Sequence, residues 1–180
     1  KLLKDTCKVA ATFGAKGVVV HGGSVGEGGD IGQGYENWAK AIKEVEDLGV
    51  KVLVENTAGG KNSVARYMDS IERLWEVIGH LNVGLCLDTC HTWAGGIPTI
   101  EAIKGFKKLV KKIDLIHFND SKDGFESSRD RHENLGKGKI PKEELEYVIK
   151  NAKTDIIVET PNGADAQKKD IAWIRRRLNK

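Results

Sequence analysis

The chain has 180 residues, and its 29 Lys and Arg against 26 Asp and Glu give a formal net charge of +3. This length suits one domain spanning residues 1–180. No run reaches the roughly 18 apolar residues that a membrane helix needs, so we expect no membrane partner. The three cysteines form no CxxC pair, which argues against a disulfide scaffold and favours a reducing compartment, the cytoplasm.

Short apolar runs alternate with amphipathic segments along the whole chain. Each run is almost continuously apolar, as in parallel strands that helices cover on both faces. We predict strands at residues 17–21, 51–55, 83–88, 113–117 and 155–159. We predict helices over residues 1–14, 38–48 (ended by Gly49), 64–78 (capped by Asn62 or Ser63 and ended by Gly79), from Pro141 to about 149, and 171–178.

The spacing of these strands favours a barrel. Their last residues are 21, 55, 88, 117 and 159, and a (β/α)₈ TIM barrel uses roughly 31 residues per strand–helix unit. Five strands cannot close a ring of eight, so we predict an α/β fold that is part of a TIM barrel lacking its N-terminal third. An open five-stranded doubly wound sheet is the alternative.

Every predicted strand ends on a residue that can bind a metal ion. These residues are His21, Glu55, Asp88, His117 and Glu159. Lys, Ser, Thr and Asn would meet water equally well at a strand end, but none occurs there. In a barrel the carboxyl ends of the strands share one rim, where active sites lie, so we expect these side chains to converge.

Two more groups follow in the predicted loops after the strands. His91 lies three residues after Asp88, and Asp130 and His132 are two residues apart. Four histidines and four carboxylates suit zinc, with manganese as a substitute, better than magnesium or calcium. Eight ligands exceed one zinc site and could serve two or three ions. Paired metal ions commonly catalyse phosphodiester cleavage.

Four segments of the chain are the most specific: VENTAGG (54–60), GLCLDTCHTWAGG (84–96), IHFNDSKDGFESSRDRHENLGKG (116–138) and VETP (158–161). Together they resemble the endonuclease IV family of apurinic/apyrimidinic endonucleases. The resemblance implies a TIM barrel with three zinc ions that hydrolyses double-stranded DNA 5′ to an abasic site, leaving a 3′-hydroxyl. The family's first three strands have no counterpart here, so we expect this chain to supply strands four to eight.

The resemblance also assigns the ligands to ions. His21 and Glu55 resemble ligands of the first zinc, with Glu55 bridging to the second, and Glu55 and Glu159 resemble catalytic carboxylates. The second zinc would take Asp88, His117 and Glu159, and the third would take His91, Asp130 and His132. A ninth family ligand, a histidine of the first zinc, belongs to the strands without a counterpart.

The long segment around the second ligand group is basic, as a DNA-binding rim requires. DNA affinity should therefore fall steeply with salt. The residues that we expect to contact DNA are Lys122, Arg129, Arg131 and Lys137, with Lys139 beside them. We expect a monomer.

Two other functions fit parts of this pattern. A metal-dependent sugar isomerase or epimerase on a related barrel would use the carboxylates, but it would leave His91 and the Asp130/His132 pair without a clear role. An inactive barrel fragment that has kept its ligands is the third interpretation.

Overall fold

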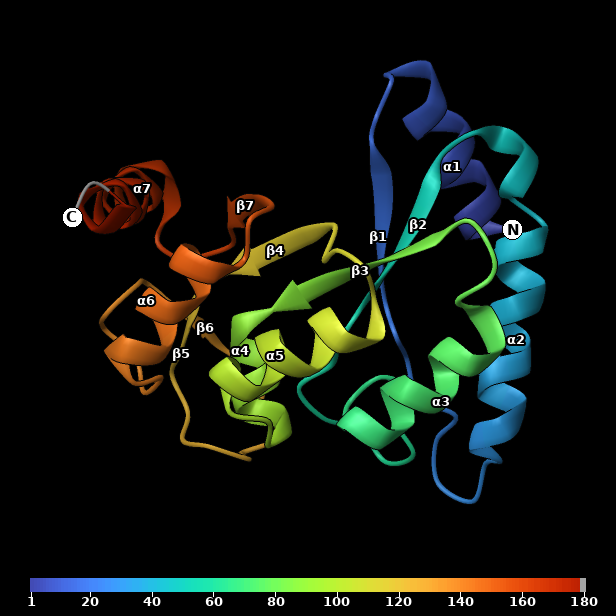
Figure 1. Cartoon of the computed structure of the whole chain (residues 1–180), viewed down its shortest axis with the longest axis horizontal. Helices are drawn as coiled ribbons and strands as arrows, with labels where there is room; N and C mark the ends of the chain where they lie inside the picture. The colour runs from blue at the N-terminus through green and yellow to red at the C-terminus, as the bar shows by residue number, and fades with distance from the viewer. Residues whose placement is uncertain (179–180) are drawn as a thin grey trace.

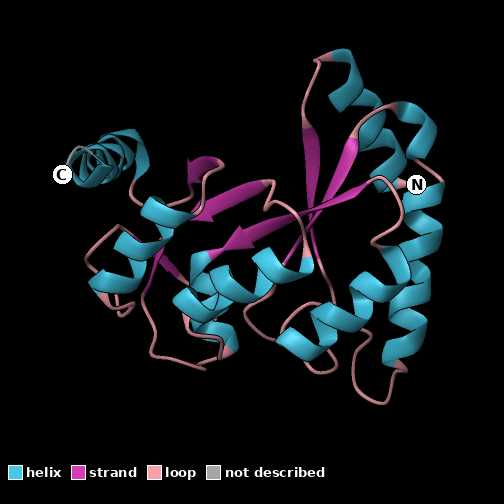
Figure 2. Cartoon of the chain, viewed as in Figure 1, coloured by secondary structure: helices cyan, strands magenta, loops and turns pink. Residues whose placement is uncertain are grey.

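The computed structural model describes residues 1–178, which form a layer of parallel strands with helices packed along its outer side (Figures 1 and 2). The strands are β1 (Gly17–His21), β2 (Lys51–Glu55), β3 (Val83–Asp88), β4 (Leu115–Phe118), β5 (Asp120–Ser121), β6 (His132–Glu133) and β7 (Asp155–Val158). The helices are α1 (Leu2–Thr12), α2 (Ile31–Lys43), η1 (Glu46–Leu48), α3 (Met68–Ile78), α4 (Thr89–Gly95), α5 (Thr99–Leu109), α6 (Lys142–Asn151) and α7 (Gly163–Leu178).

The main sheet has the strand order of a barrel. Its order is β1-β2-β3-β4-β7, and every neighbouring pair is parallel. Sequential strands of this sheet are therefore always neighbours, whereas a doubly wound sheet reverses its strand order at a switch point. The strands also turn strongly along the sheet, from steep β1 and β2 to the much flatter β3 and β4 in Figure 1. The predicted partial TIM barrel is confirmed, and the doubly wound alternative is wrong.

The apolar core lies between this sheet and the helices. On α3, Ile71, Leu74 and Ile78 repeat every three or four residues, and all three are fully buried. They belong to the same core cluster as Leu85 and Leu87 of β3. Burying a side chain of this size contributes about 1.5–3 kcal/mol, so this packing fixes the position of the strand ends.

The helix predicted at 64–78 begins later than expected. Its first residue is Met68, and the residue before it, Tyr67, is its cap in place of Asn62 or Ser63. The reason is tertiary pairing, because the Val64 N–H donates to the Gly23 carbonyl and the Ala65 carbonyl accepts from Thr57 N–H. This backbone is already paired and cannot join the helix.

Other helix and strand boundaries also differ from the predictions, and α7 begins at Gly163 rather than at residue 171. Helix α2 begins at Ile31, where Asp30 caps it by accepting from the Gly32 N–H, and it ends at Lys43 before a short 3₁₀ turn. Strand β4 begins at Leu115 rather than at residue 113, and Pro141 precedes α6 as its cap. The sequence pattern does not predict the short helix α4.

All three cysteines are buried and free. Among residues 1–178, no helix combines the length and apolar character that crossing a membrane requires.

Candidate metal centre

Strand register brings the polar strand ends together. His21 of β1 pairs with Glu55 of β2, and Asp88 of β3 pairs with His117 of β4. Glu159 follows β7 directly, and its N–H donates to the Phe118 carbonyl of β4. Parallel strands in register therefore deliver the five side chains to one rim.

Glu55 occupies the middle of the cluster. Its side chain is 2% exposed, and its two oxygens lie 3.0 Å from His117 Nδ1 and 3.3 Å from His21 Nε2. Burial favours the neutral acid, but hydrogen bonds from His117 and His21 outweigh it and lower the pKa of Glu55 to about 2. Glu55 is therefore an ionised carboxylate with one oxygen directed to each side.

A second group lies on the His117 side of Glu55. Glu159 Oε2 lies 2.9 Å from His117 Nδ1, and the Asp88 carboxylate is fully buried beside them. One ligand atom from each of Glu55, Asp88, His117 and Glu159 lies within 4.8 Å of the others. This set of three carboxylates and one imidazole has the size and composition of a zinc site.

A third group forms around Asp130. Its two carboxylate oxygens each lie 3.1 Å from an imidazole nitrogen, Oδ2 from His91 Nε2 and Oδ1 from His132 Nε2. Asp130 is half-exposed, whereas His91 is 2% exposed. Burial disfavours the charged imidazole of His91, but the nearby acids outweigh it and raise the pKa of His91 to about 9.

The residues present fit metal ions. His91 Nε2 is buried and has no hydrogen-bond partner within residues 1–178, because its 3.1 Å approach to Asp130 lacks hydrogen-bond geometry. Its other nitrogen, Nδ1, lies 2.9 Å from the Asn56 carbonyl oxygen, an arrangement that orients the ring. An imidazole oriented through one nitrogen, with the other buried and without a hydrogen bond, is typical of a metal ligand.

All eight predicted ligand residues thus lie in one cluster, with several differences in detail. His132 begins strand β6 and does not lie in a loop, and Cys90 groups with Asp130 and His132. His91 lies in helix α4, which Asp88 caps by accepting from the His91 N–H, and not in a loop. His91 also groups with His21 and Glu55 as well as with Asp88 and His132. His91 therefore lies between the three predicted ligand sets and contacts residues of each.

Two asparagines of the site were missed by the sequence reasoning. Asn119 Nδ2 donates to Asp88 Oδ2 at 2.6 Å, and its Oδ1 accepts from the Cys90 N–H. Asn56 Oδ1 accepts from the Asp88 N–H. Only their positions in the sequence could have indicated a role in the site, because Asn56 directly follows Glu55 and Asn119 follows His117 by two residues.

A buried carboxylate organises the segment that carries Asp130 and His132. Asp120 accepts four backbone N–H groups at 2.8–3.0 Å, and within the described residues it bonds to no basic side chain. Burial raises the pKa of Asp120, and these hydrogen bonds oppose that rise. The donors are Ser121, Gly136, Gly138 and Ile140.

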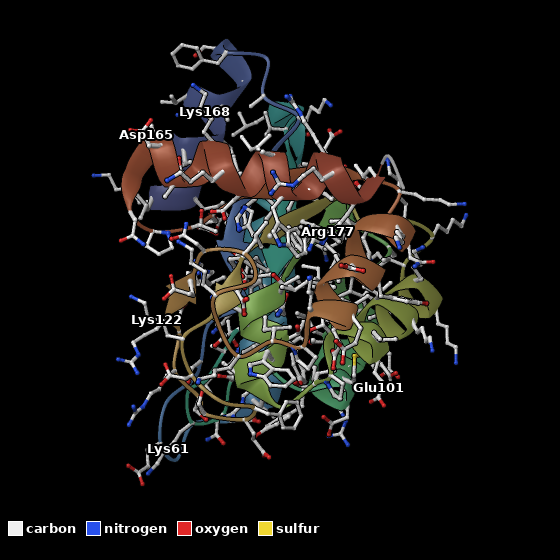
Figure 3. All side chains as sticks on the ribbon, turned by 90° about the vertical axis from the view of Figure 1, so that its left-hand side faces the viewer. Lys61, Glu101, Lys122, Asp165, Lys168 and Arg177 are labelled. Atoms are coloured by element: carbon white, nitrogen blue, oxygen red, sulfur yellow. The ribbon has the colours of Figure 1, made fainter. Side chains whose placement is uncertain are left out.

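The predicted DNA contacts, Lys122, Arg129, Arg131 and Lys137, are all exposed on the same long segment. Figure 3 shows Lys122 pointing outward on the same side of the molecule as Lys61. Arg131 is already paired, because its Nε and Nη2 bond both oxygens of Asp123. Arg129 Nη1 lies 3.6 Å from the same carboxylate.

Comparison with known proteins agrees with this fold. A family model described as xylose isomerase-like TIM barrel matches residues 1–177. The proteins named probable endonuclease 4 from Mycobacterium ulcerans and Mycobacterium tuberculosis (strain CDC 1551 / Oshkosh) are 45% and 46% identical to this chain. The alignments cover 99% and 98% of this chain and 70% and 69% of those proteins.

Solved structures give the same result. Endonuclease IV from Thermus thermophilus superposes with a TM-score of 0.77 at 31% identity, over 98% of this chain and 66% of that one. A D-tagatose 3-epimerase-like protein reaches the same TM-score at 19% identity, over 98% of this chain and 67% of that one, and supports the fold alone.

Fold and site together define a sector of a xylose isomerase-like TIM barrel with a His- and carboxylate-rich centre at the carboxyl ends of its strands. Within that class, the chain belongs to the endonuclease IV family. It spans about two thirds of the length of the relatives that it matches.

Proposed function

We propose that this chain carries the catalytic centre of a zinc-dependent endonuclease that cleaves double-stranded DNA on the 5′ side of abasic sites and leaves a 3′-hydroxyl. The observation that carries the proposal is the cluster of four imidazoles and four carboxylates. Membership of the endonuclease IV family supports it.

The ligands would divide into three sets. His21 and Glu55 would hold the first zinc, and Glu55 would bridge to the second zinc with Asp88, His117 and Glu159. His91, Asp130 and His132 would hold the third zinc. Four nitrogen and oxygen ligands suit each zinc ion, and manganese accepts the same donors.

When bound, adjacent zinc ions stabilise the charge on a phosphodiester and supply a nucleophilic water at neutral pH. The protein holds these ligands rigidly on one side and leaves the other side open. Glu55, Asp88 and His91 are buried, whereas Asp130 and Glu159 have 49% and 51% of their side chains exposed. A substrate phosphate would therefore approach over Asp130 and Glu159.

The basic segment beside this open side would bind the DNA backbone. Lys122 and Arg131 line a cleft together with His132, Glu159 and Thr160. Lysine and arginine side chains contact phosphates without reading the base sequence. An abasic nucleotide has lost its stacking, so rotating it out of the duplex costs less free energy than for an intact nucleotide.

The direct test is a nicking assay on a duplex with one synthetic abasic site, with and without a strong chelator. We expect chelator-sensitive cleavage 5′ to the lesion and a 3′-hydroxyl product. Glu55→Gln should abolish cleavage and keep measurable DNA binding, because Glu55 lies between two ligand sets. Glu101→Gln, on the exposed side of α5, is the matched control and should cleave normally.

Zinc binding without any nicking would reject the nuclease proposal. Turnover of a ketose or aldose by the same zinc-loaded chain would then favour the isomerase or epimerase alternative. Cleavage by Glu55→Gln at the wild-type rate would remove the bridging role from Glu55.

A further inference from the structure

Helix α4 carries His91, and the four carbonyls at its C-terminal end all find partners. In a helix the last four carbonyls have no partner within the helix. The Thr92 carbonyl accepts from the Ile97 N–H, and the Trp93 carbonyl accepts from the N–H groups of Gly96 and Glu126. This end of α4 is therefore a docking point for other segments.

The segment that docks there is the 122–131 loop, which contains Asp130 and is followed directly by His132. The Glu126 N–H donates to the Trp93 carbonyl at 3.0 Å, and the Ser128 N–H donates to the Ala94 carbonyl at 2.9 Å. The Trp93 indole N–H also donates to the Asp123 carbonyl at 3.2 Å. Helix α4, the loop and the residue that follows it together carry the third ligand set.

The backbone of this loop is strained where it docks. Glu126 and Ser128 have φ values of 60° and 58°, in the left-handed region that side chains disfavour. Such conformations persist only where surrounding contacts hold them. The loop therefore depends on its partners to keep Asp130 near His91.

Arg66, from the segment between β2 and α3, makes the remaining contacts. Its Nε donates to the Gly95 carbonyl at 3.2 Å, and its Nη2 donates to Ser128 Oγ at 2.7 Å. Its guanidinium also lies 4.7 Å from the centre of the Tyr67 ring. One side chain thus spans the end of α4 and the loop, and its positive charge lies at the favourable end of the helix.

We propose that Arg66 is a positioning residue for the third metal ion: it locks the 122–131 loop onto α4 and thereby holds Asp130 and His132 opposite His91. This inference rests on the metal centre proposed above. The hydrogen bonds of the Arg66 side chain go to Ser128 and Gly95 and not to the three ligands, so its effect passes through those two residues.

The test compares Arg66→Ala and Arg66→Lys with the wild-type chain, with Arg73→Ala as the matched control. Arg73 is an exposed arginine of α3 that lines the same cleft as Arg66. After dialysis against limiting free zinc, Arg66→Ala should hold about one zinc ion fewer per folded chain than wild type, because a zinc ion needs about four ligands and the third set would be dispersed. Arg73→Ala should hold the wild-type number. Arg66→Lys should regain the ion at a higher zinc concentration, because lysine can reach only one of the two partners.

Amide hydrogen exchange of the metal-free chain gives a second readout. Arg66→Ala should speed exchange at the Glu126 and Ser128 amides and leave the β2 amides unchanged, and Ser128→Ala should do so more weakly. If Arg66→Ala exchanges faster but the wild-type chain binds fewer than three zinc ions, the locking role of Arg66 is supported and the proposed three-ion centre is rejected. Unchanged amide exchange in Arg66→Ala would overturn the inference. An Arg66→Ala chain that still binds three zinc ions, as the wild type does, would overturn it as well.

Discussion

At the scale of single residues, the site depends on buried donors that face the carboxylates. Asp88 is fully buried, and its Oδ2 receives a hydrogen bond from Asn119 Nδ2. Asn119 is buried as well, and its Oδ1 accepts from the Cys90 N–H and from Thr89 Oγ1. Asn119 therefore determines where the Asp88 carboxylate lies before any metal ion binds.

Replacing Asn119 should destabilise the metal-free protein. In Asn119→Ala the Asp88 Oδ2 atom and the Cys90 N–H each lose a hydrogen bond, although Asp88 Oδ1 keeps the one from the His91 N–H. This loss should lower the free energy of unfolding by about 1–3 kcal/mol. Urea denaturation of the chelator-treated chain measures this change. Asn37→Ala, at an exposed position of α2, removes a side chain of the same kind and should change stability far less. Equal losses in both variants would contradict the role of Asn119.

Asp123 should limit the DNA affinity of the basic segment. It accepts hydrogen bonds from Nε and Nη2 of Arg131 and lies near Arg129, so a phosphate must compete with it for these cations. Removing the Asp123 carboxylate frees these guanidinium groups for phosphate, so Asp123→Asn should bind DNA more tightly than the wild-type chain. Titration of a fluorescent abasic duplex at fixed salt measures this. Weaker binding by the variant would show that Asp123 orients Arg131 for DNA instead.

The sequence predicts the ligands better than the residues that support them. Ligands stand out because His21, Glu55 and Asp88 end apolar strands, where any polar residue would suffice. Asn56 and Asn119 carry no comparable signal, because asparagine is common in loops and their partners lie about 30 residues away in the chain. The pairing of Arg131 with Asp123 depends on the loop conformation, which residue types alone do not determine.

At the scale of elements, helix α7 helps to position Glu159 and His132. Asp170, on α7, is 4% exposed and accepts from Thr160 Oγ1, Asn134 Nδ2 and the Leu135 N–H. It thereby connects α7 both to the turn that follows Glu159 and to the segment that follows His132. The position of two predicted ligands thus depends on a helix that contributes no ligand.

Asp170→Asn should loosen this connection. Thr160 and Asn134 both donate to Oδ2, so an amide nitrogen in that position would oppose two donors. We expect the free energy of unfolding to fall by about 1–3 kcal/mol, as for a buried polar group left without a partner. Asp165→Asn, near the start of the same helix and exposed, is the control (Figure 3). A control that loses as much stability as Asp170→Asn would show that helix charge alone explains the effect.

The sequence predicts helices in proportion to their amphipathic signal. In α3 the apolar stripe is clear, although backbone pairing at Val64 and Ala65 delays its start. Helix α4 has only seven residues, and six of them are buried, so it has no polar face to produce a helical period. Its residues therefore resemble a loop in the sequence, although Asp88 caps the helix.

At the scale of the whole molecule, metal binding should couple distant parts of the chain. The proposed ligands come from the ends of five strands, from helix α4, and from the 122–131 loop and its neighbour His132. Without metal ions, several carboxylates and imidazoles share one small volume, where only ion pairs and hydrogen bonds compensate their burial. Zinc should therefore stabilise the sheet as a unit and not only the local site.

Zinc should raise the thermal unfolding temperature, and a chelator should reverse the rise. A ligand that binds only the folded state stabilises it by about 2.7 kcal/mol per site at a hundredfold excess over Kd. Calorimetry of the chelator-treated chain, with zinc added back stepwise, measures the gain.

His132→Ala should show a smaller gain and about one bound ion fewer, because the third set would keep only His91 and Asp130. His80→Ala, which alters the one histidine outside the cluster, should behave as wild type. If zinc left the unfolding temperature unchanged in the wild-type chain, the eight residues would not form a metal centre in this chain.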